Sequence, residues 1–161
     1  IRDSSEVHLI LGSALFLLFG LVPTAFGLVI GLLAKGILLA PSDLPQYGMN
    51  FTTLLLPLFL ASAVAERIIP RKTAYQNLNY GQVLQLSLVY QGGIVSWVAF
   101  WAFYGQGFGA ENIVQVLSFG AAYLTVIVLE PLINLGLLAG VKAFPALNSS
   151  SLLSRRLFQP A

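Results

Sequence analysis

The sequence predicts an all-α protein, a polytopic transmembrane helical bundle of about five helical segments. The 161 residues are 57% hydrophobic and only 9% charged, with a mean hydropathy of +0.84, whereas an ordinary soluble domain carries about 25% charged residues. Three stretches have no charged side chain: residues 9–34, 44–65 and 73–110. Each exceeds the roughly 20 apolar residues that a helix needs to cross a bilayer. A soluble core of this size could not bury all three.

The composition also excludes several classes of function. The chain has no cysteine, so disulfides and thiolate metal sites are ruled out. It has one histidine, six dispersed acidic residues and no basic cluster, so it offers no hydrolytic triad, zinc-protease motif or nucleic-acid-binding surface. We therefore predict a protein that is not an enzyme and binds no nucleic acid.

The apolar runs and their helix breakers divide the membrane domain. Proline at position 23 separates the first two segments. The first segment is too short to cross a bilayer at 1.5 Å per residue, so the first two form a helical hairpin or one kinked helix, and flanking glycines favour the hairpin. We predict a polar segment 1–7, a single domain 8–144 and a polar tail 145–161, with helical segments at residues 8–20, 24–40, 47–67, 82–104 and 112–144.

Basic residues predict the orientation. Most of them lie in residues 67–72 and in the C-terminal part of the chain. Two spans separate these groups, so both are expected on the cytoplasmic side of what we take to be a bacterial inner membrane. The His8 end of the first segment is then expected to face outward. Because the chain starts at Ile1 and its first residues do not read as a signal peptide, we expect the gene product to extend upstream.

Two pairs of glycines have the spacing that lets membrane helices approach closely. Gly27 and Gly31 form the first pair, and Gly136 and Gly140 form the second. Such small residues, four apart, predict helix packing at these positions.

Glu130 is the ionisable residue expected deepest in the membrane. In the fifth segment 18 uncharged residues precede it and 11 follow, and such a group costs several kcal/mol unless it is paired or hydrated. Pro131 frees backbone carbonyls beside it, and Asn134 lies at i+4 on the same helix face. The residues alone leave open whether Glu130 is structural or functional.

Two further places carry polar residues at helix entrances. In QYGMNFTT, residues 46–53, Asn50 is expected to cap the third helix, and the hydroxyls of Thr52 and Thr53 are expected to bond within it. In SSEVHLILG, residues 4–12, His8 stands where polar residues meet apolar ones. By itself His8 is either an interfacial histidine or a metal ligand.

Three motifs, in their order and spacing, resemble the CbiM/NikM-type substrate-capture permeases. They are HLILGSALFLLFGLVPTAF at 8–26, YGMNFTT at 47–53 and LEPLINLGLLAGVKAFPAL at 129–147. The resemblance implies a membrane subunit of an energy-coupling factor transporter. Its substrate would be Co(II) or Ni(II), and a separate coupling protein and ATPases would be its partners, in addition to membrane lipid.

The resemblance also implies roles for individual residues. His8 corresponds to a metal-binding histidine of the family, Asn50 to an asparagine that supports the site, and Glu130 to the glutamate of the late helix. Thr53 replaces a second asparagine, and Tyr123 stands where the family often has a histidine. The family's other metal donors lie in an N-terminal MHIPDG segment that the printed sequence lacks. The alternative is therefore a degenerate relative that acts as an accessory or structural subunit of a larger membrane complex.

Overall fold

The computed structural model of the protein describes residues 11–70 and 73–143, and within these ranges it contains helices and no strand. The all-α fold class is therefore confirmed. The helix bounds agree with the predicted segments to within a few residues. The elements are α1 (Gly12–Phe19), α2 (Leu21–Leu38), the 3₁₀ helix η1 (Pro41–Gln46), α3 (Tyr47–Ile68), the 3₁₀ helix η2 (Tyr75–Asn77), α4 (Tyr80–Gln106) and α5 (Ala110–Ala143).

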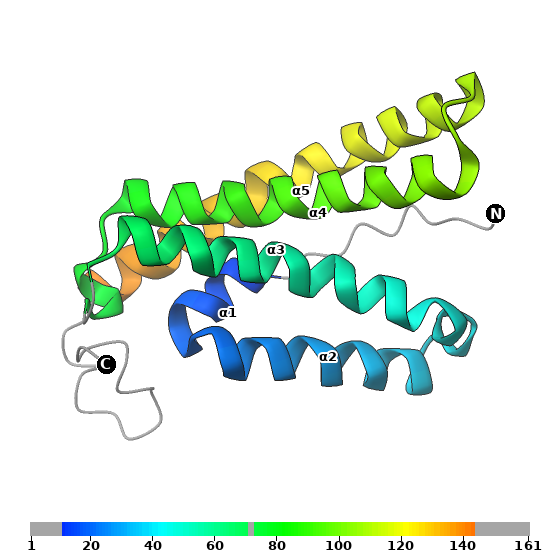
Figure 1. Ribbon diagram of the computed structural model, residues 1–161. Helices are drawn as coiled ribbons and strands as arrows, with labels where there is room; N and C mark the ends of the chain where they lie inside the picture. The colour runs from blue at the N-terminus through cyan, green and yellow to red at the C-terminus, as the bar shows by residue number, and fades with distance from the viewer. Residues whose placement is uncertain (1–10, 71–72, 144–161) are drawn as a thin grey trace.

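The long helices form an antiparallel bundle. Figure 1 shows α2, α3 and α4 side by side, each running opposite to the next, with α5 packed against α4. The short α1 contacts α2, α3 and α4. The stretches Leu21–Leu38, Pro41–Ile68, Tyr80–Gln106 and Ala110–Ala143 are long and apolar enough to cross a membrane. With eight residues, α1 is not, since about 20 are needed.

The first two helices form the predicted hairpin. Helix α1 starts in the middle of the bundle, and after the turn α2 runs back in the opposite direction beside α3 (Figure 1). The turn is made by Gly20 alone, with φ 90° and ψ 178°, a conformation that only glycine adopts readily. The break was predicted at residues 21–23 and lies slightly earlier. Pro23 falls within the first turn of α2, where its missing N–H costs no helical hydrogen bond.

The predicted glycine pairs do not mediate packing between the described helices. A Cβ atom added at Gly27, Gly31, Gly136 or Gly140 would meet nothing within 4 Å, so no described residue approaches these glycines closely, and a packing role for them stays a prediction. A close approach occurs elsewhere. A Cβ atom at Gly93 would lie 2.8 Å from Pro57, so this glycine of α4 accommodates the proline ring of α3.

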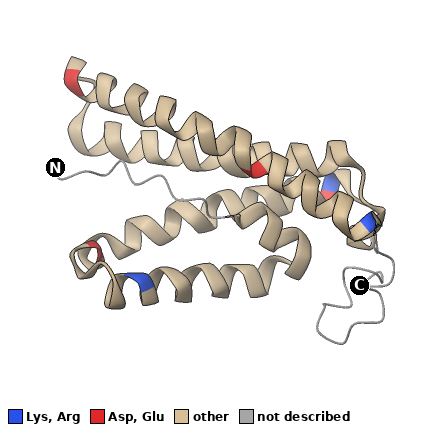
Figure 2. Ribbon diagram, turned by 180° about the vertical axis from the view of Figure 1, so that it is seen from behind, with Lys and Arg blue, Asp and Glu red and all other residues tan. Residues whose placement is uncertain are grey.

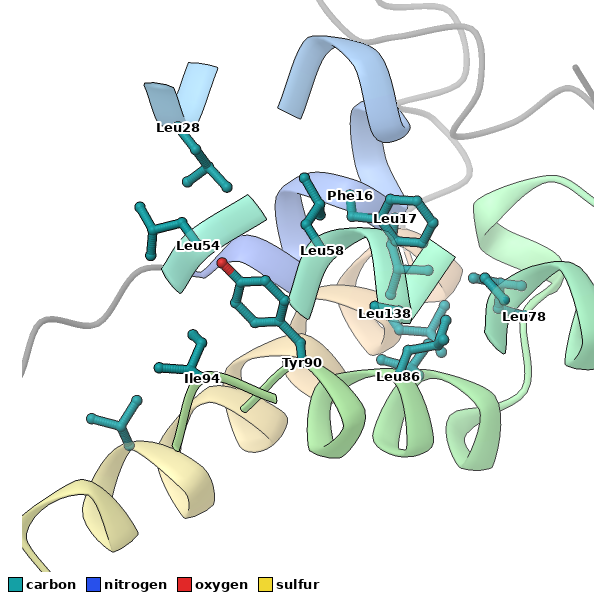
Figure 3. Packing of buried hydrophobic residues seen from close by; sticks show 14 of the residues in the cluster. Phe16, Leu17, Leu28, Leu54, Leu58, Leu78, Leu86, Tyr90, Ile94 and Leu138 are labelled. Carbon is teal, nitrogen blue, oxygen red and sulfur yellow. The ribbon is translucent and has the colours of Figure 1, made fainter. Parts of the chain in front are cut away.

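The hydrophobic core is formed by residues of α1 and of all four long helices. Figure 3 shows Tyr90 of α4 beside Leu54 and Leu58 of α3, with its hydroxyl pointing towards Leu54. The Tyr90 ring also fills the space above Gly12, where an added Cβ atom would lie 2.3 Å from its Cζ and Oη atoms. The start of α1 is therefore packed directly against the core of the bundle.

The few charged residues gather near the two ends of the bundle, with one exception in the middle of α5 (Figure 2). Arg67 lies in the last turn of α3 and Lys142 in the last turn of α5. Lys142 donates to the Leu78 carbonyl at 2.7 Å, and this bond joins the end of α5 to the residues just before α4. Glu111 and Asp43 belong to the first turn of α5 and to η1.

Candidate functional site

The charged residue in the middle of the bundle is Glu130. It is fully buried, on a face of α5 whose buried members from Tyr123 to Leu138 are mostly three or four residues apart. This spacing places them on one side of a helix, and the side faces α4, the main partner of α5. Its buried members are Asn112, Tyr123, Val126, Glu130, Pro131, Asn134 and Leu138.

The Glu130 carboxylate joins three helices. Its Oε1 atom accepts from the Ser13 hydroxyl of α1 at 2.7 Å, and the backbone N–H of Ser13 points at the same atom from 3.4 Å. Its Oε2 atom accepts from the amide Nε2 of Gln91 in α4. The buried carboxylate therefore replaces water by donors from two neighbouring helices, as a buried charged group requires.

Asn134 and Ser87 extend this network. Asn134 Nδ2 donates to Ser13 Oγ at 2.8 Å and to Ser87 Oγ at 3.2 Å. Ser87 and Gln91 are four residues apart on α4, as Glu130 and Asn134 are on α5, so each pair projects from one helix face. All five side chains are fully buried. We call Ser13, Ser87, Gln91, Glu130 and Asn134 the Glu130 cluster.

The cluster holds the start of α1 in place. The residue that caps α1, Leu11, has the left-handed conformation with φ 52° and ψ 29°, and it provides no side-chain cap. That conformation costs a non-glycine residue about 1–2 kcal/mol. The Glu130 carboxylate, close to the first N–H groups of α1, offsets this cost because a negative charge is favourable at a helix N-terminus. A carboxylate from α5 therefore takes the role of the missing cap.

Several buried polar atoms near these residues have no partner among the described groups. They include the hydroxyls of Tyr90 and Tyr123 and the amide oxygens Gln91 Oε1 and Asn134 Oδ1. An unsatisfied buried polar atom costs about 1–3 kcal/mol. Two such atoms, Gln91 Oε1 and Asn134 Oδ1, belong to the Glu130 cluster, which indicates that the cluster does more than pack the helices together.

The structure brings together only some of the predicted site residues. Glu130 and Asn134 lie on one helix face, as predicted, and the structure shows in addition that they share Ser13 as a partner. Tyr123 lies on the same buried face of α5. Among the described hydrogen bonds, none joins Asn50 or Thr53 to the cluster.

Asn50 does not cap α3, because the helix begins at Tyr47 and its N-cap is Gln46, with no side-chain cap bond. The capping prediction was therefore wrong: 3₁₀ helix η1 leads directly into α3, and the N-cap lies four residues before Asn50. The prediction for the two threonines is confirmed, since Thr52 and Thr53 both donate to the Met49 carbonyl, at 2.8 and 2.9 Å.

His8 lies outside the described residues, so its role stays a prediction. The start of α1 that the structure does describe lies deep in the bundle, beside Ser87 and Glu130, and the side of the membrane that the His8 end faces stays a prediction. Within residues 11–70 and 73–143, no three His, Cys, Asp or Glu side chains come together as a metal site.

Sequence reasoning missed Ser13, Ser87 and Gln91. A signal was present for the last two, because polar residues four apart in an apolar segment predict a polar stripe on one helix face. Ser13 gave no such signal, since its partner lies 117 residues away in the chain.

Comparison with known protein families assigns the chain to one of them. The family model described as "Cobalt uptake substrate-specific transmembrane region", CbiM, matches residues 1–146. The chain belongs to the CbiM family. Searches of curated proteins and of solved structures gave no match. With its four apolar helices of spanning length, this CbiM-family chain is an integral membrane protein, from a family of transport components rather than enzymes.

Proposed function

We propose that this CbiM-family protein captures Co(II) or Ni(II) as the cargo of a metal uptake system. It would hand the ion to a transmembrane coupling protein driven by separate ATPases, and would not hydrolyse ATP itself. The observation that carries the proposal is the Glu130 carboxylate at the start of α1, in a chain whose family is named for cobalt uptake.

The Glu130 cluster contacts the start of α1 through Ser13, and the expected metal ligand, His8, lies just before this helix in the sequence. His8 precedes Leu11 by three residues, so its Cα atom is at most about 11 Å from that of Leu11 along an extended chain. Fixing Leu11 and Ser13 therefore limits where the imidazole can lie. Imidazole nitrogen suits Co(II) and Ni(II). Removing a group that orients a metal ligand without touching the metal lowers the metal affinity about 10–100-fold. We assign this orienting role to Ser13 and Glu130.

The outer surface of the bundle supports membrane partners. Large apolar side chains on α2 and α5 are exposed, among them Phe26, Ile30, Val128 and Leu132. Lipid covers such surfaces in a membrane protein, and part of them is available to a coupling protein. We place the end that carries Arg67 and Lys142 in the cytoplasm of a bacterial cell, by the positive-inside rule.

The alternative, an accessory or structural subunit without a metal site, is separated from metal capture by one experiment. Calorimetric titration of Co(II) and Ni(II) into the purified protein in detergent is expected to show saturable binding, and His8→Ala is expected to abolish it. Asp43→Asn, which removes a carboxylate from η1, serves as the matched control and should bind like the wild type. Absence of saturable binding, or equal binding by His8→Ala, would reject metal capture at His8 and favour the accessory role.

A further inference from the structure

We propose that the Glu130 cluster is itself a cation site, which binds one sodium ion in the middle of the bundle. The site shares Ser13 and Glu130 with the orienting role proposed above, but sodium binding there does not require Co(II) or Ni(II) capture at His8. Three observations carry the proposal: the lack of a counter-charge for Glu130, the chemistry of the surrounding atoms, and two buried amide oxygens without a partner.

Glu130 has no basic partner among the described residues. The groups that act on its carboxyl are the Ser13 hydroxyl, backbone N–H groups of α1, and the Gln91 amide. Lys142 lies twelve residues further along α5, which is about 18 Å on a helix, and it donates to the Leu78 carbonyl. A carboxylate in the bilayer interior without a counter-charge is expensive. A bound cation would remove that cost.

The two unpartnered amide oxygens belong to side chains that already touch the cluster. Gln91 donates through Nε2 to Glu130, so its free Oε1 atom is held within a few ångströms of the carboxylate. Asn134 donates through Nδ2 to Ser13 Oγ at 2.8 Å, and its Oδ1 atom is also buried without a partner. Because C=O and C–N bonds are about 1.23 and 1.33 Å long, each amide oxygen is anchored close to the nitrogen that makes the contact.

The potential ligands are all oxygen atoms, from Glu130, the two amides and the hydroxyls of Ser13 and Ser87. Carboxylate, carbonyl and hydroxyl oxygens suit hard cations, whereas Co(II) and Ni(II) favour imidazole nitrogen. One carboxylate neutralises one positive charge, so a divalent ion would leave a buried excess charge. The hydroxyl and amide contacts of 2.7–3.4 Å make a compact cluster, which favours sodium over the larger potassium ion.

The test is sodium binding by the full chain in detergent with EDTA present, so that transition metals play no part. We expect radioactive ²²Na⁺ to bind with a stoichiometry of one per chain. The melting temperature should rise with sodium at constant ionic strength, with choline as the replacement ion, because a ligand that binds only the folded state stabilises it. Glu130→Gln should lower sodium affinity at least tenfold, whereas Glu111→Gln, which removes an exposed charge from the same helix, should bind like the wild type.

Ser87→Ala provides a second variant if Glu130→Gln fails to fold, and it should lower sodium affinity several-fold. Three results would overturn the proposal. One is a melting temperature that does not respond to sodium, including the case in which it responds only to pH and Glu130 carries a proton instead. Another is an equal response to potassium. The last is unchanged sodium affinity in folded Glu130→Gln or Ser87→Ala. Co(II) binding enters none of these measurements, so failure here is distinct from failure of the proposed function.

Discussion

The Ser13 hydroxyl of α1 lies 2.7 Å from Oε1 of Glu130 in α5, across 117 positions of the chain. Replacing Ser13 by alanine leaves one buried carboxylate oxygen short of its closest donor and deprives Asn134 of an acceptor. We expect Ser13→Ala to lower the free energy of unfolding by about 1–3 kcal/mol, measured by SDS titration of the protein in mixed micelles. Ser96→Ala removes an exposed hydroxyl that bonds only within α4 and should change it by less than about 0.5 kcal/mol. Equal effects of the two substitutions would contradict the assigned contact.

Gly12 gives a steric test of the same helix start. A Cβ atom there would lie 2.3 Å from the Cζ and Oη atoms of the buried Tyr90, so Gly12→Ala should destabilise the protein by about 1–3 kcal/mol. Gly27→Ala is the matched control, since nothing lies within 4 Å of its added Cβ, and there the higher helix propensity of alanine should be neutral or stabilising. A Gly12→Ala protein with wild-type stability would show that α1 does not pack on Tyr90.

Neighbouring glycines in α4 test the contact between α3 and α4. An added Cβ at Gly93 would lie 2.8 Å from Pro57, whereas one at Gly92 would meet nothing within 4 Å. We expect Gly93→Ala to lower the melting temperature and Gly92→Ala to leave it unchanged or raise it, because the first overpacks a contact and the second only improves helix propensity. Thermal unfolding followed by circular dichroism compares the two, and the reverse order would refute the packing of Pro57 on Gly93.

The buried Tyr75 side chain is expected to make the folded protein less stable at alkaline pH. Its ring is buried in η2, between the spans, and its hydroxyl has no partner. Burial raises the pKa of Tyr75 to about 12, whereas in the unfolded chain the pKa is about 10. The unfolded state therefore loses its proton first, so stability is unaffected below pH 10 and falls as the pH rises towards 12, by up to about 2–3 kcal/mol.

Tyr75→Phe removes the titrating group and its unpartnered hydroxyl. We expect this variant to equal or exceed the wild-type stability at pH 8 and to lose less stability between pH 10 and 12, as measured by unfolding titrations across this range. Tyr104→Phe, at an exposed tyrosine, controls for loss of any phenol. A wild-type alkaline profile in Tyr75→Phe would mean that Tyr75 does not carry the effect.

The helices could be read from the sequence because long uncharged runs and prolines determine them locally. Glu130 and Asn134 could also be found, since an acid inside an apolar segment is costly and i+4 spacing places both on one face. Ser13 could not be found, because its importance depends on a contact with a residue 117 positions away. The same applies to Gly12 and Gly93, whose tight contacts are with Tyr90 and Pro57. By contrast, the four glycines chosen by spacing alone make no such contact.

The central claim is that Glu130 and Ser13 hold the start of α1 so that the segment before it captures a transition metal. Its most direct test is the Ni(II) affinity of Ser13→Ala against that of the wild type and Ser96→Ala, by calorimetry at a fixed sodium concentration. We predict saturable binding by the wild type and Ser96→Ala, and an affinity about 10–100-fold lower in Ser13→Ala. Equal affinity in folded Ser13→Ala and wild type, or no saturable binding by the wild type, would contradict the account.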